Sequence, residues 1–225
     1  MRKSILSLVF SVLLATMGFT TSSNALGLEG LGVGFSIGTA GYYAEGEEQT
    51  DNQKTGEDMA KDAGAFQHDV GSVFLEYTAG PVTIGLDYAI EDITTPEATN
   101  VQWTSDSSKA LLTNNVKASF ENHTTLYAIL PVFHALYLKA GVIHVDIVTQ
   151  EDLGTGGDYG NTDTQGVTVG FGFSHVLKDG VSVRAEALYA EYDNVKLTNS
   201  KNTTTSVQIT EMMGASGRVS IVKTF

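Results

Sequence analysis

Residues 166–189 read GVTVGFGFSHVLKDGVSVRAEALY, and this stretch decides the fold. In its first half, small or polar residues alternate with apolar ones at the two-residue period of a β-strand. The apolar residues are Val167, Val169, Phe171 and Phe173. Residues 178–180 (KDG) predict a tight turn, after which the alternation resumes with Arg184 and Glu186 among the polar positions. The stretch therefore predicts a β-hairpin with one apolar face.

Two architectures use a hairpin of this kind. A soluble β-sandwich buries the apolar face and exposes the polar one, but the many glycines here would then weaken the solvent-facing surface. A transmembrane barrel turns the apolar face toward lipid and fills a narrow lumen with small and charged residues. The rest of the chain is needed to choose between these two architectures.

The N-terminus has the features of a secretory signal peptide. Arg2 and Lys3 precede an apolar run, and residues 23–25 form a small-x-small cleavage site. We therefore expect residues 1–25 to be a signal peptide and residues 26–225 to be the exported domain. An apolar run of about 15 residues falls short of the ~20 that a membrane-spanning helix needs, which disfavours a helical anchor.

Composition narrows the classes of function. The chain has 225 residues, which suits one domain, and it has no cysteine, which excludes a lipoprotein anchor and a disulfide framework. Its 26 acidic residues outnumber 13 basic ones. We expect such an acidic chain not to bind nucleic acid.

Alternation recurs along the whole exported part of the chain. Strands are expected at residues 33–44, 72–79, 82–91, 114–130 and 138–147, in the hairpin at 166–189, and in a last strand that ends at residue 225. Long connections are expected at residues 45–65, 92–113, 151–165 and 194–206. Outer-membrane barrels have an even number of strands, with long extracellular loops and short periplasmic turns. The expected fold is therefore all-β, an eight-stranded antiparallel up-and-down transmembrane β-barrel with both termini in the periplasm.

Aromatic residues fall where such a barrel places its girdles. Tyr43, Tyr88 and Tyr189 lie at the loop ends of predicted strands. Tyr77, Phe173 and Phe225 lie at the turn ends. Because all of them share the apolar parity, we expect two aromatic girdles on the lipid-facing surface.

Two predicted strands have an ambiguous pattern. At residues 114–130 we place Leu126, Ala128 and Leu130 outward. That choice puts Lys117, Glu121 and His123 inside. At residues 138–147 the apolar parity changes after Val142, and a β-bulge near Val142 is the simplest explanation, turning Ile143, Val145 and Ile147 outward.

The pattern and length resemble those of the small eight-stranded outer-membrane barrels of Gram-negative bacteria, such as the OmpX type and the membrane domain of OmpA, which are porin-like in architecture. In that family the last residue is usually Phe, with apolar residues at alternate preceding positions. Phe225, Ile221 and Val219 match, whereas Lys223 departs from the pattern. The resemblance implies that the C-terminal strand, and Phe225 above all, is the signal read by the barrel-assembly machinery. It also implies an environment of outer-membrane lipid and lipopolysaccharide.

Charged residues with the inward parity form the candidate site. They are Glu76, Asp87, Glu91, Lys117, Glu121, Lys139, Arg184, Glu186 and Arg218. An eight-stranded lumen is just wide enough to be filled by side chains, which favours a structural ion-pair network that plugs the barrel. A gate that admits ions is the alternative.

Three functions are ranked on these grounds. We expect a structural or interaction barrel at the cell surface, whose acidic loops attract divalent cations or basic partners. A passive channel for ions or small solutes comes second, and a lipid A-modifying enzyme is a distant third. Ser174 and His175 are neighbours on a strand and so point to opposite faces, which prevents the base from reaching the hydroxyl. His144 and Asp146 share a face but have no serine at their level, so we expect no enzymatic activity, no resident metal and no cofactor.

Overall fold

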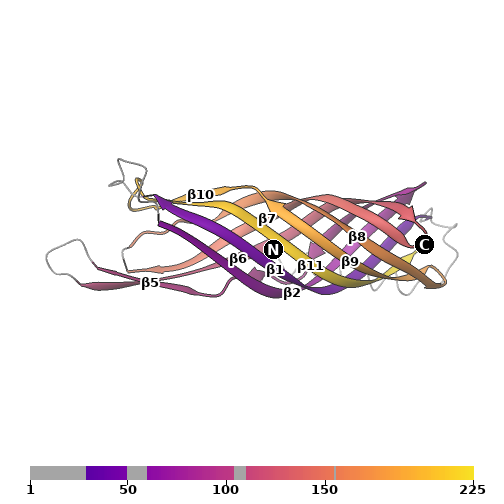
Figure 1. Cartoon of the computed structure of the whole chain (residues 1–225), viewed down its shortest axis with the longest axis horizontal. Coiled ribbons are helices and arrows are strands. Elements are labelled where there is room, and N and C mark those ends of the chain that lie inside the picture. Colours follow the sequence, from indigo (N-terminus) through magenta and orange to yellow (C-terminus); the bar gives the residue numbers. More distant parts are fainter. Residues whose placement is uncertain (1–28, 50–59, 104–109, 155) are drawn as a thin grey trace.

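The computed structural model describes residues 29–49, 60–103, 110–154 and 156–225. These residues form a long tube of antiparallel strands (Figure 1). The strands are β1 (Leu31–Gln49), β2 (Ala60–Ala79), β3 (Val82–Ala89), β4 (Ile93–Thr94), β5 (Ala98–Trp103), β6 (Leu111–Phe133), β7 (Leu136–Leu153), β8 (Thr162–Lys178), β9 (Val181–Tyr192), β10 (Val195–Thr198) and β11 (Ser206–Thr224). The predicted signal peptide lies outside the described residues. Within the described ranges there is no helix long and apolar enough to cross a membrane.

The sheet closes on itself. Neighbouring strands pair antiparallel in the order β1, β2, β3, β6, β7, β8, β9, β11, and β11 pairs back onto β1 from Gly32↔Thr224 to Gln49↔Ser206. Two wall positions are built from successive short strands: β3, β4 and β5 all pair with β6, and β9 and β10 both pair with β11. The ring therefore has eight wall positions, and the predicted all-β, eight-stranded up-and-down barrel is confirmed.

The turns between strands follow the predicted alternation of short and long. The KDG turn joins β8 to β9, with φ of 51° at Asp179 and 74° at Gly180. Both central residues are thus in the left-handed region that a two-residue type I′ hairpin turn requires. Gly80 has φ of 61° in the equally short turn between β2 and β3.

The long connections are shorter than the sequence suggests. Strand β1 continues to Gln49 and β2 begins at Ala60, so most of the predicted loop at residues 45–65 is paired strand. Likewise β4 and β5 lie within the predicted loop at 92–113, β7 reaches Leu153, and β10 lies within the loop at 194–206. Antiparallel pairing continues above the membrane belt, where the outer strand face meets water instead of lipid, so the alternation typical of a lipid-facing strand does not mark it in the sequence.

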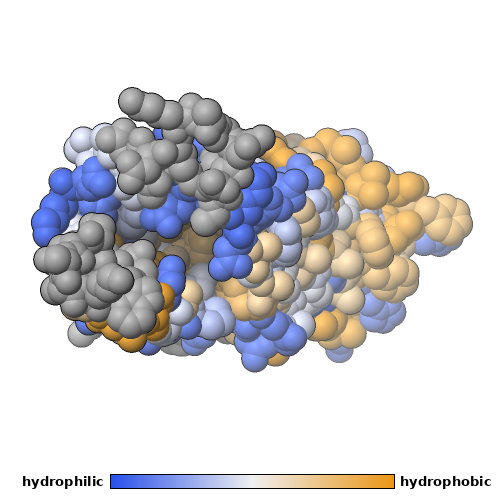
Figure 2. Space-filling view, turned by 60° about the vertical axis from the view of Figure 1, so that its left-hand side comes forward, coloured by the Kyte–Doolittle hydropathy of each residue, from blue (hydrophilic) through white to orange (hydrophobic). Residues whose placement is uncertain are grey.

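The outward face in the membrane part is apolar, as the alternation predicts. Val169 on β8 and Leu86 on β3 are 53% and 49% exposed, and other exposed apolar residues with the same outward parity include Ile37, Leu75, Ile84, Leu126, Leu138, Phe171, Val219 and Ile221. Figure 2 shows that orange, hydrophobic residues gather toward one end of the tube, whereas the loop end has a blue, hydrophilic rim. A belt of this kind matches the lipid-facing band of a membrane barrel.

The prediction of a bulge near Val142 is wrong. Strand β7 keeps one parity throughout, so Ile143, Val145 and Ile147 point inward with Tyr137 and Lys139, and all five are buried. The bulge lies across the ladder in β6, where three steps from Glu121 to Thr124 face two steps from Asp146 to His144. Asn122 has a positive φ of 54° at this point. The apolar residues of upper β7 therefore line the lumen instead of facing lipid.

The outward parity makes a measurable prediction. Val169→Arg should lower the free energy of unfolding from lipid vesicles by ~2–4 kcal/mol, because the cation must reach the interface or draw water inward. Val101→Arg is the matched control, since Val101 is 49% exposed on β5, in the part of the wall above the membrane belt. Denaturant titration of the two refolded variants should show a large effect at Val169 and little at Val101. Equal effects at the two sites would show that the belt is assigned wrongly.

Candidate functional site

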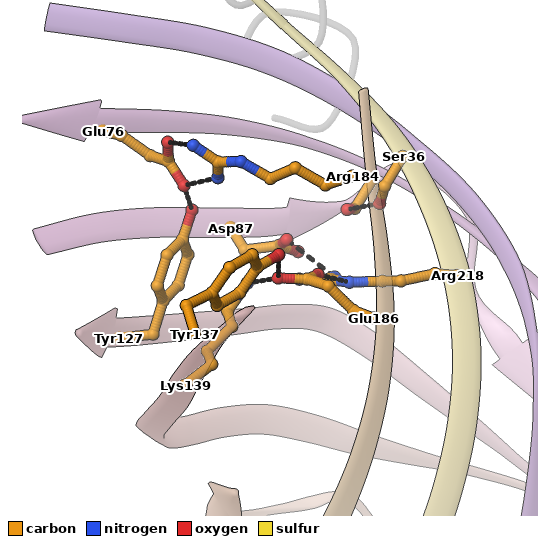
Figure 3. A network of polar contacts seen from close by, with 10 residues as sticks. Ser36, Glu76, Asp87, Tyr127, Tyr137, Lys139, Arg184, Glu186 and Arg218 are labelled. Atoms are coloured by element: carbon orange, nitrogen blue, oxygen red, sulfur yellow. Dashed lines mark hydrogen bonds and ion pairs between the residues drawn. The ribbon is translucent and has the colours of Figure 1, made fainter. Parts of the chain in front are cut away.

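A layer of charged side chains crosses the lumen between strands that are not neighbours (Figure 3). Arg184 of β9 donates to both oxygens of Glu76 on β2, with Nη1–Oε1 at 2.6 Å and Nη2–Oε2 at 2.8 Å. This is the bidentate geometry in which a guanidinium binds a carboxylate most strongly. Tyr127 of β6 donates a further hydrogen bond to Glu76 Oε1 at 2.7 Å. Glu76 therefore links three separate strands.

Glu186 of β9 is the second centre of the layer. Its Oε1 accepts from Tyr137 Oη at 2.8 Å and from Lys139 Nζ at 3.3 Å, both on β7, and its Oε2 accepts from Arg218 Nε at 2.5 Å. Arg218 of β11 also donates from Nη1 to Asp87 Oδ2 on β3 at 2.9 Å. The carboxylates of Glu186 and Asp87 are thus joined through one guanidinium.

Aromatic rings fill the space around these ion pairs. Lys139 Nζ lies 3.6 Å from the centre of the Tyr127 ring, and Arg184 lies over Tyr137 at 5.8 Å, both cation–π contacts. Each ring lies across a glycine of the adjacent strand: a Cβ at Gly85 would come within 2.4 Å of Tyr127, and one at Gly172 within 2.3 Å of Tyr137. The glycines are needed there because the rings occupy the space that a side chain would take.

The layer is balanced in charge. Three carboxylates (Glu76, Asp87, Glu186) meet three cations (Lys139, Arg184, Arg218), and the carboxylates and Lys139 are almost fully buried. Removing charges from water is costly unless each is paired and hydrogen-bonded, and every one of these is. Beside the layer the hydroxyls of Ser36 and Ser72 lie 2.7 Å apart. The side chains therefore cross-link the walls of the lumen at this level.

The sequence matches the model of one protein family, described as outer membrane protein beta-barrel domain, over residues 11–210. The chain belongs to this family. It is therefore a protein of the bacterial outer membrane, and its outward belt meets outer-membrane lipid and lipopolysaccharide. This is the environment that the alternation of the strands predicts.

Solved structures of outer-membrane proteins are similar in fold. One is OprG from Pseudomonas aeruginosa, at 12% identity and a TM-score of 0.47, covering 88% of this chain and 97% of that one. Another is the protease OmpT from Escherichia coli, at 8% identity and a TM-score of 0.46, covering 87% and 96%. A third is Ail, the attachment invasion locus protein of Yersinia pestis, at 16% identity and a TM-score of 0.28, covering 84% and 99%. No curated protein matches the sequence.

Three charged residues predicted to lie in this barrel's lumen do not join the layer. Lys117 and Glu121 precede the bulge of β6, which reverses the faces, so they share a face with Gln150 and the part-exposed Asp146 instead of with the lumen. Glu91 is exposed in the bend after β3. The prediction for Lys117 and Glu121 is wrong because the apolar alternation of residues 114–130 is weak, and a one-residue bulge cannot be recognised in such a pattern.

The histidines are distributed between the two faces. His123 faces inward as predicted, and its Nε2 lies 3.1 Å from Tyr192 Oη. His144 is on the outer face, with Nε2 3.5 Å from Asp146, while Asn122 donates to the other oxygen of that carboxylate at 2.6 Å. Among the described residues there is no group of three or more His, Asp or Glu side chains placed to hold a metal ion. The attraction of the acidic loops for divalent cations stays a prediction.

The residues named for the aromatic girdles lie at the two ends of the outward face. Tyr77, Phe173 and Tyr189 are 55%, 57% and 38% exposed, and Tyr43, Tyr88 and Phe225 are half-buried. Tyr189 donates to Glu191 at 2.8 Å and Tyr88 to Asn122 at 3.2 Å. Phe225 exchanges backbone hydrogen bonds with Gly30 and Leu31 at 2.9 Å, and Lys223 Nζ lies 5.5 Å from the centre of its ring. Their role as girdles, and that of Phe225 in assembly, stay predictions.

One feature of the lumen was missed by the sequence reasoning. Toward the loop end the interior is apolar, with Ile147, Val195 and Met212 buried together against Phe120 and Tyr192. Ile143, Val145 and Ile147 keep the inward parity of Lys139, and this parity is the signal that could have predicted the apolar interior. The prediction failed because it assumed that a barrel interior is polar along its full length.

The layer makes a stability prediction. Arg218→Ala should destabilise the barrel by ~3–5 kcal/mol, because Glu186 and Asp87 lose a cation in a buried setting. Lys61→Ala is the control: it removes a cross-strand ion pair with Glu47 at the exposed loop end, where solvent screens the charges. Urea titration of vesicle-refolded protein should show a large loss for Arg218→Ala and none for Lys61→Ala. If Arg218→Ala unfolds at the same urea midpoint as the wild type, the layer does not contribute to the stability of the barrel.

Proposed function

We propose that this protein is a non-conducting, non-enzymatic barrel that holds acidic strand extensions at the cell surface for contact with basic partners. One observation carries the proposal: the charge-balanced layer crosses the lumen, while the wall continues far beyond what a membrane requires. A transmembrane strand needs about 9–11 residues. Strands β1, β2, β6 and β11 have 19, 20, 23 and 19.

The extensions are acidic and bonded to one another. Above Tyr43 and Tyr189 the neighbouring strands carry Glu45, Glu47, Glu48, Glu191 and Glu211. Glu47 pairs with Lys61 across the β1–β2 ladder, and this hydrogen bond raises the pKa of the Lys61 ammonium. Within the described part of the chain the other four glutamates form no ion pair, so the rim carries a negative potential that favours basic molecules.

Two connections at this end are bonded to each other. Ser200 N donates to Asp158 O at 2.7 Å, and Asp158 N donates to Ser200 Oγ at 3.0 Å, which ties the connection after β7 to the one after β10. Burial, together with the charges of Glu48 and Glu151, raises the pKa of Tyr159 to about 12. A surface ordered in advance loses less entropy when it binds a partner.

The other candidate functions have weaker support. A passive channel needs a continuous water path, and the cross-lumen pairs of Arg184 with Glu76 and of Arg218 with Asp87 obstruct such a path. A lipid-modifying enzyme needs an activated nucleophile, whereas the contacts of Asp146 are with His144 and Asn122. The proposal therefore assigns the lumen a structural role and the loop end the functional one.

The proposal requires the loop end to face outward and the termini to lie in the periplasm. The protein has no cysteine, so single cysteines can be introduced without background. Thr203→Cys, in the exposed turn before β11, should react with a membrane-impermeant maleimide on intact cells. Lys178→Cys, at the exposed turn between β8 and β9, should react only after the outer membrane is permeabilised. The opposite labelling pattern would reverse the orientation.

The function is tested by two measurements on the same refolded protein. In planar bilayers it should add no single-channel steps, because ion pairs cross the lumen. A Lys-rich peptide should bind vesicles that carry the protein, and binding should weaken with added salt, since exposed charges are screened within ~10 Å at 0.1 M. Regular conductance steps would favour a channel instead.

Matched variants locate the binding. Glu45→Gln, Glu191→Gln and Glu211→Gln combined should remove most of the peptide affinity. Asp179→Asn at the opposite end should leave it unchanged, because asparagine tolerates the positive φ of that position. Peptide binding that survives the triple change would contradict the assignment of the acidic rim.

A further inference from the structure

The apolar outer half of the lumen contains a cavity whose lining includes none of the charged residues of the ion-pair layer. Its volume is about 120 Å³, and its walls include Tyr42, Phe66, Ile93, Phe120, Tyr192 and Met212. These side chains come from β1, β2, β4, β6, β9 and β11, so the cavity is a feature of the closed barrel and not of one loop. From this we propose that the cavity is a binding site for a small apolar molecule about the size of one aromatic ring.

The chemistry of the wall selects an apolar occupant. Tyr42 and Phe66 stack with their ring centres 5.2 Å apart, and Met212 belongs to the buried apolar cluster with Ile147. Two polar pairs of the wall are already hydrogen-bonded: His123 with Tyr192 at 3.1 Å, and Thr95 Oγ1 with the amide of Ala118 at 3.0 Å. A ligand therefore gains little from polar groups of its own and much from burying carbon.

The volume sets the size of the occupant. An engineered apolar protein cavity of about 150 Å³ stays dry and binds benzene or xenon. A cavity of 120 Å³ is close to that size, and its flexible Met212 side chain allows the small adjustment required. A drug-sized molecule needs a pocket of ≈ 300–1,000 Å³ and is too large.

The wall has a seam beside the cavity. Strand β2 pairs with β3 only from Ser72 to Ala79, and the last backbone bond across this side joins Ile90 N to Gly71 O at 2.9 Å. Above that point the described part of β2 pairs with β1 alone, while β4 and β5 pair with β6. Phe66 and Ile93, on the two sides of the seam, both line the cavity. An apolar molecule can thus enter by displacing side chains without breaking a β-ladder.

Two methionines allow a direct test. Met212 points into the cavity, and the next residue, Met213, lies on the outer face beside Tyr189, whose Oη is 3.8 Å from its sulfur. The protein is refolded in detergent micelles with ¹³C-methyl methionine, and benzene is titrated in. The Met212 methyl resonance should shift and saturate, with nuclear Overhauser contacts to benzene. The Met213 methyl should change only in proportion to the benzene that partitions into the micelle.

A pair of substitutions on one strand provides the control. Ala118 of β6 lines the cavity, whereas Ala128 of the same strand faces lipid. Ala118→Phe should reduce the Met212 shift about tenfold or more, because the added ring fills the space. Ala128→Phe should leave the titration unchanged. If Ala118→Phe fails to fold, Ala44→Leu fills the cavity from β1 with a smaller change.

The outcomes are distinct. A Met212 shift that does not saturate, or that persists unchanged in a folded cavity-filling variant, would overturn the site. Contacts from Met212 to detergent or lipid chains before benzene is added would assign the cavity to an acyl chain and would also overturn the proposal for a free small molecule. Neither result bears on conductance or on peptide binding at the acidic rim, so this proposal and the proposed function can fail separately.

Discussion

The structure depends on the pairing of β11 with β1. In lipid, each backbone amide or carbonyl without a partner costs several kcal/mol, so a sheet can cross the membrane only if it has no free edge. The ladder from Gly32↔Thr224 to Gln49↔Ser206 removes the last two edges of the ring. At its lower end, Phe225 is bonded on both its amide and its carbonyl, to Leu31 and Gly30. Closure forces successive residues of every strand to face lipid and lumen alternately.

Closure also explains why the lumen contains charges at all. Eight strands enclose a space just wide enough for side chains, so polar groups from facing walls meet directly. Arg184 on β9 binds Glu76 on β2, and Arg218 on β11 binds Asp87 on β3, so both arginines bridge strands that share no ladder. The intact network adds little net stability, because burying its charges costs free energy, but removing one partner leaves a buried charge unpaired and is strongly destabilising. Its effect is therefore to fix one arrangement of the walls at that level.

Above the ion-pair layer the same barrel is built on different chemistry. The bulge in β6 at Asn122 reverses which residues of that strand face inward, bringing Phe120 against Ile147 in place of Lys117 or Glu121. The interior changes there from ion pairs to apolar contacts, and the third wall position is divided into β3, β4 and β5. A polar plug beneath an apolar cavity with a seam at its side is the result.

The sequence alone determined the features that follow from alternation: the eight wall positions, the short turn at Asp179, and the lipid-facing side of Leu86 and Val169. It also indicated which charges lie within reach of one another, since Glu76, Asp87, Lys139, Arg184, Glu186 and Arg218 keep the inward parity of strong strands. Where the alternation is weak, only the tertiary structure decided which face a residue occupies and how far a strand extends. Lys117 and Glu121 precede a one-residue bulge that reverses their faces, and the outer face of the strand extensions meets water instead of lipid, so neither keeps the periodic signal of the membrane part. The apolar cavity also depends on the tertiary structure, because Tyr42, Phe66 and Phe120 become neighbours only when the ring closes.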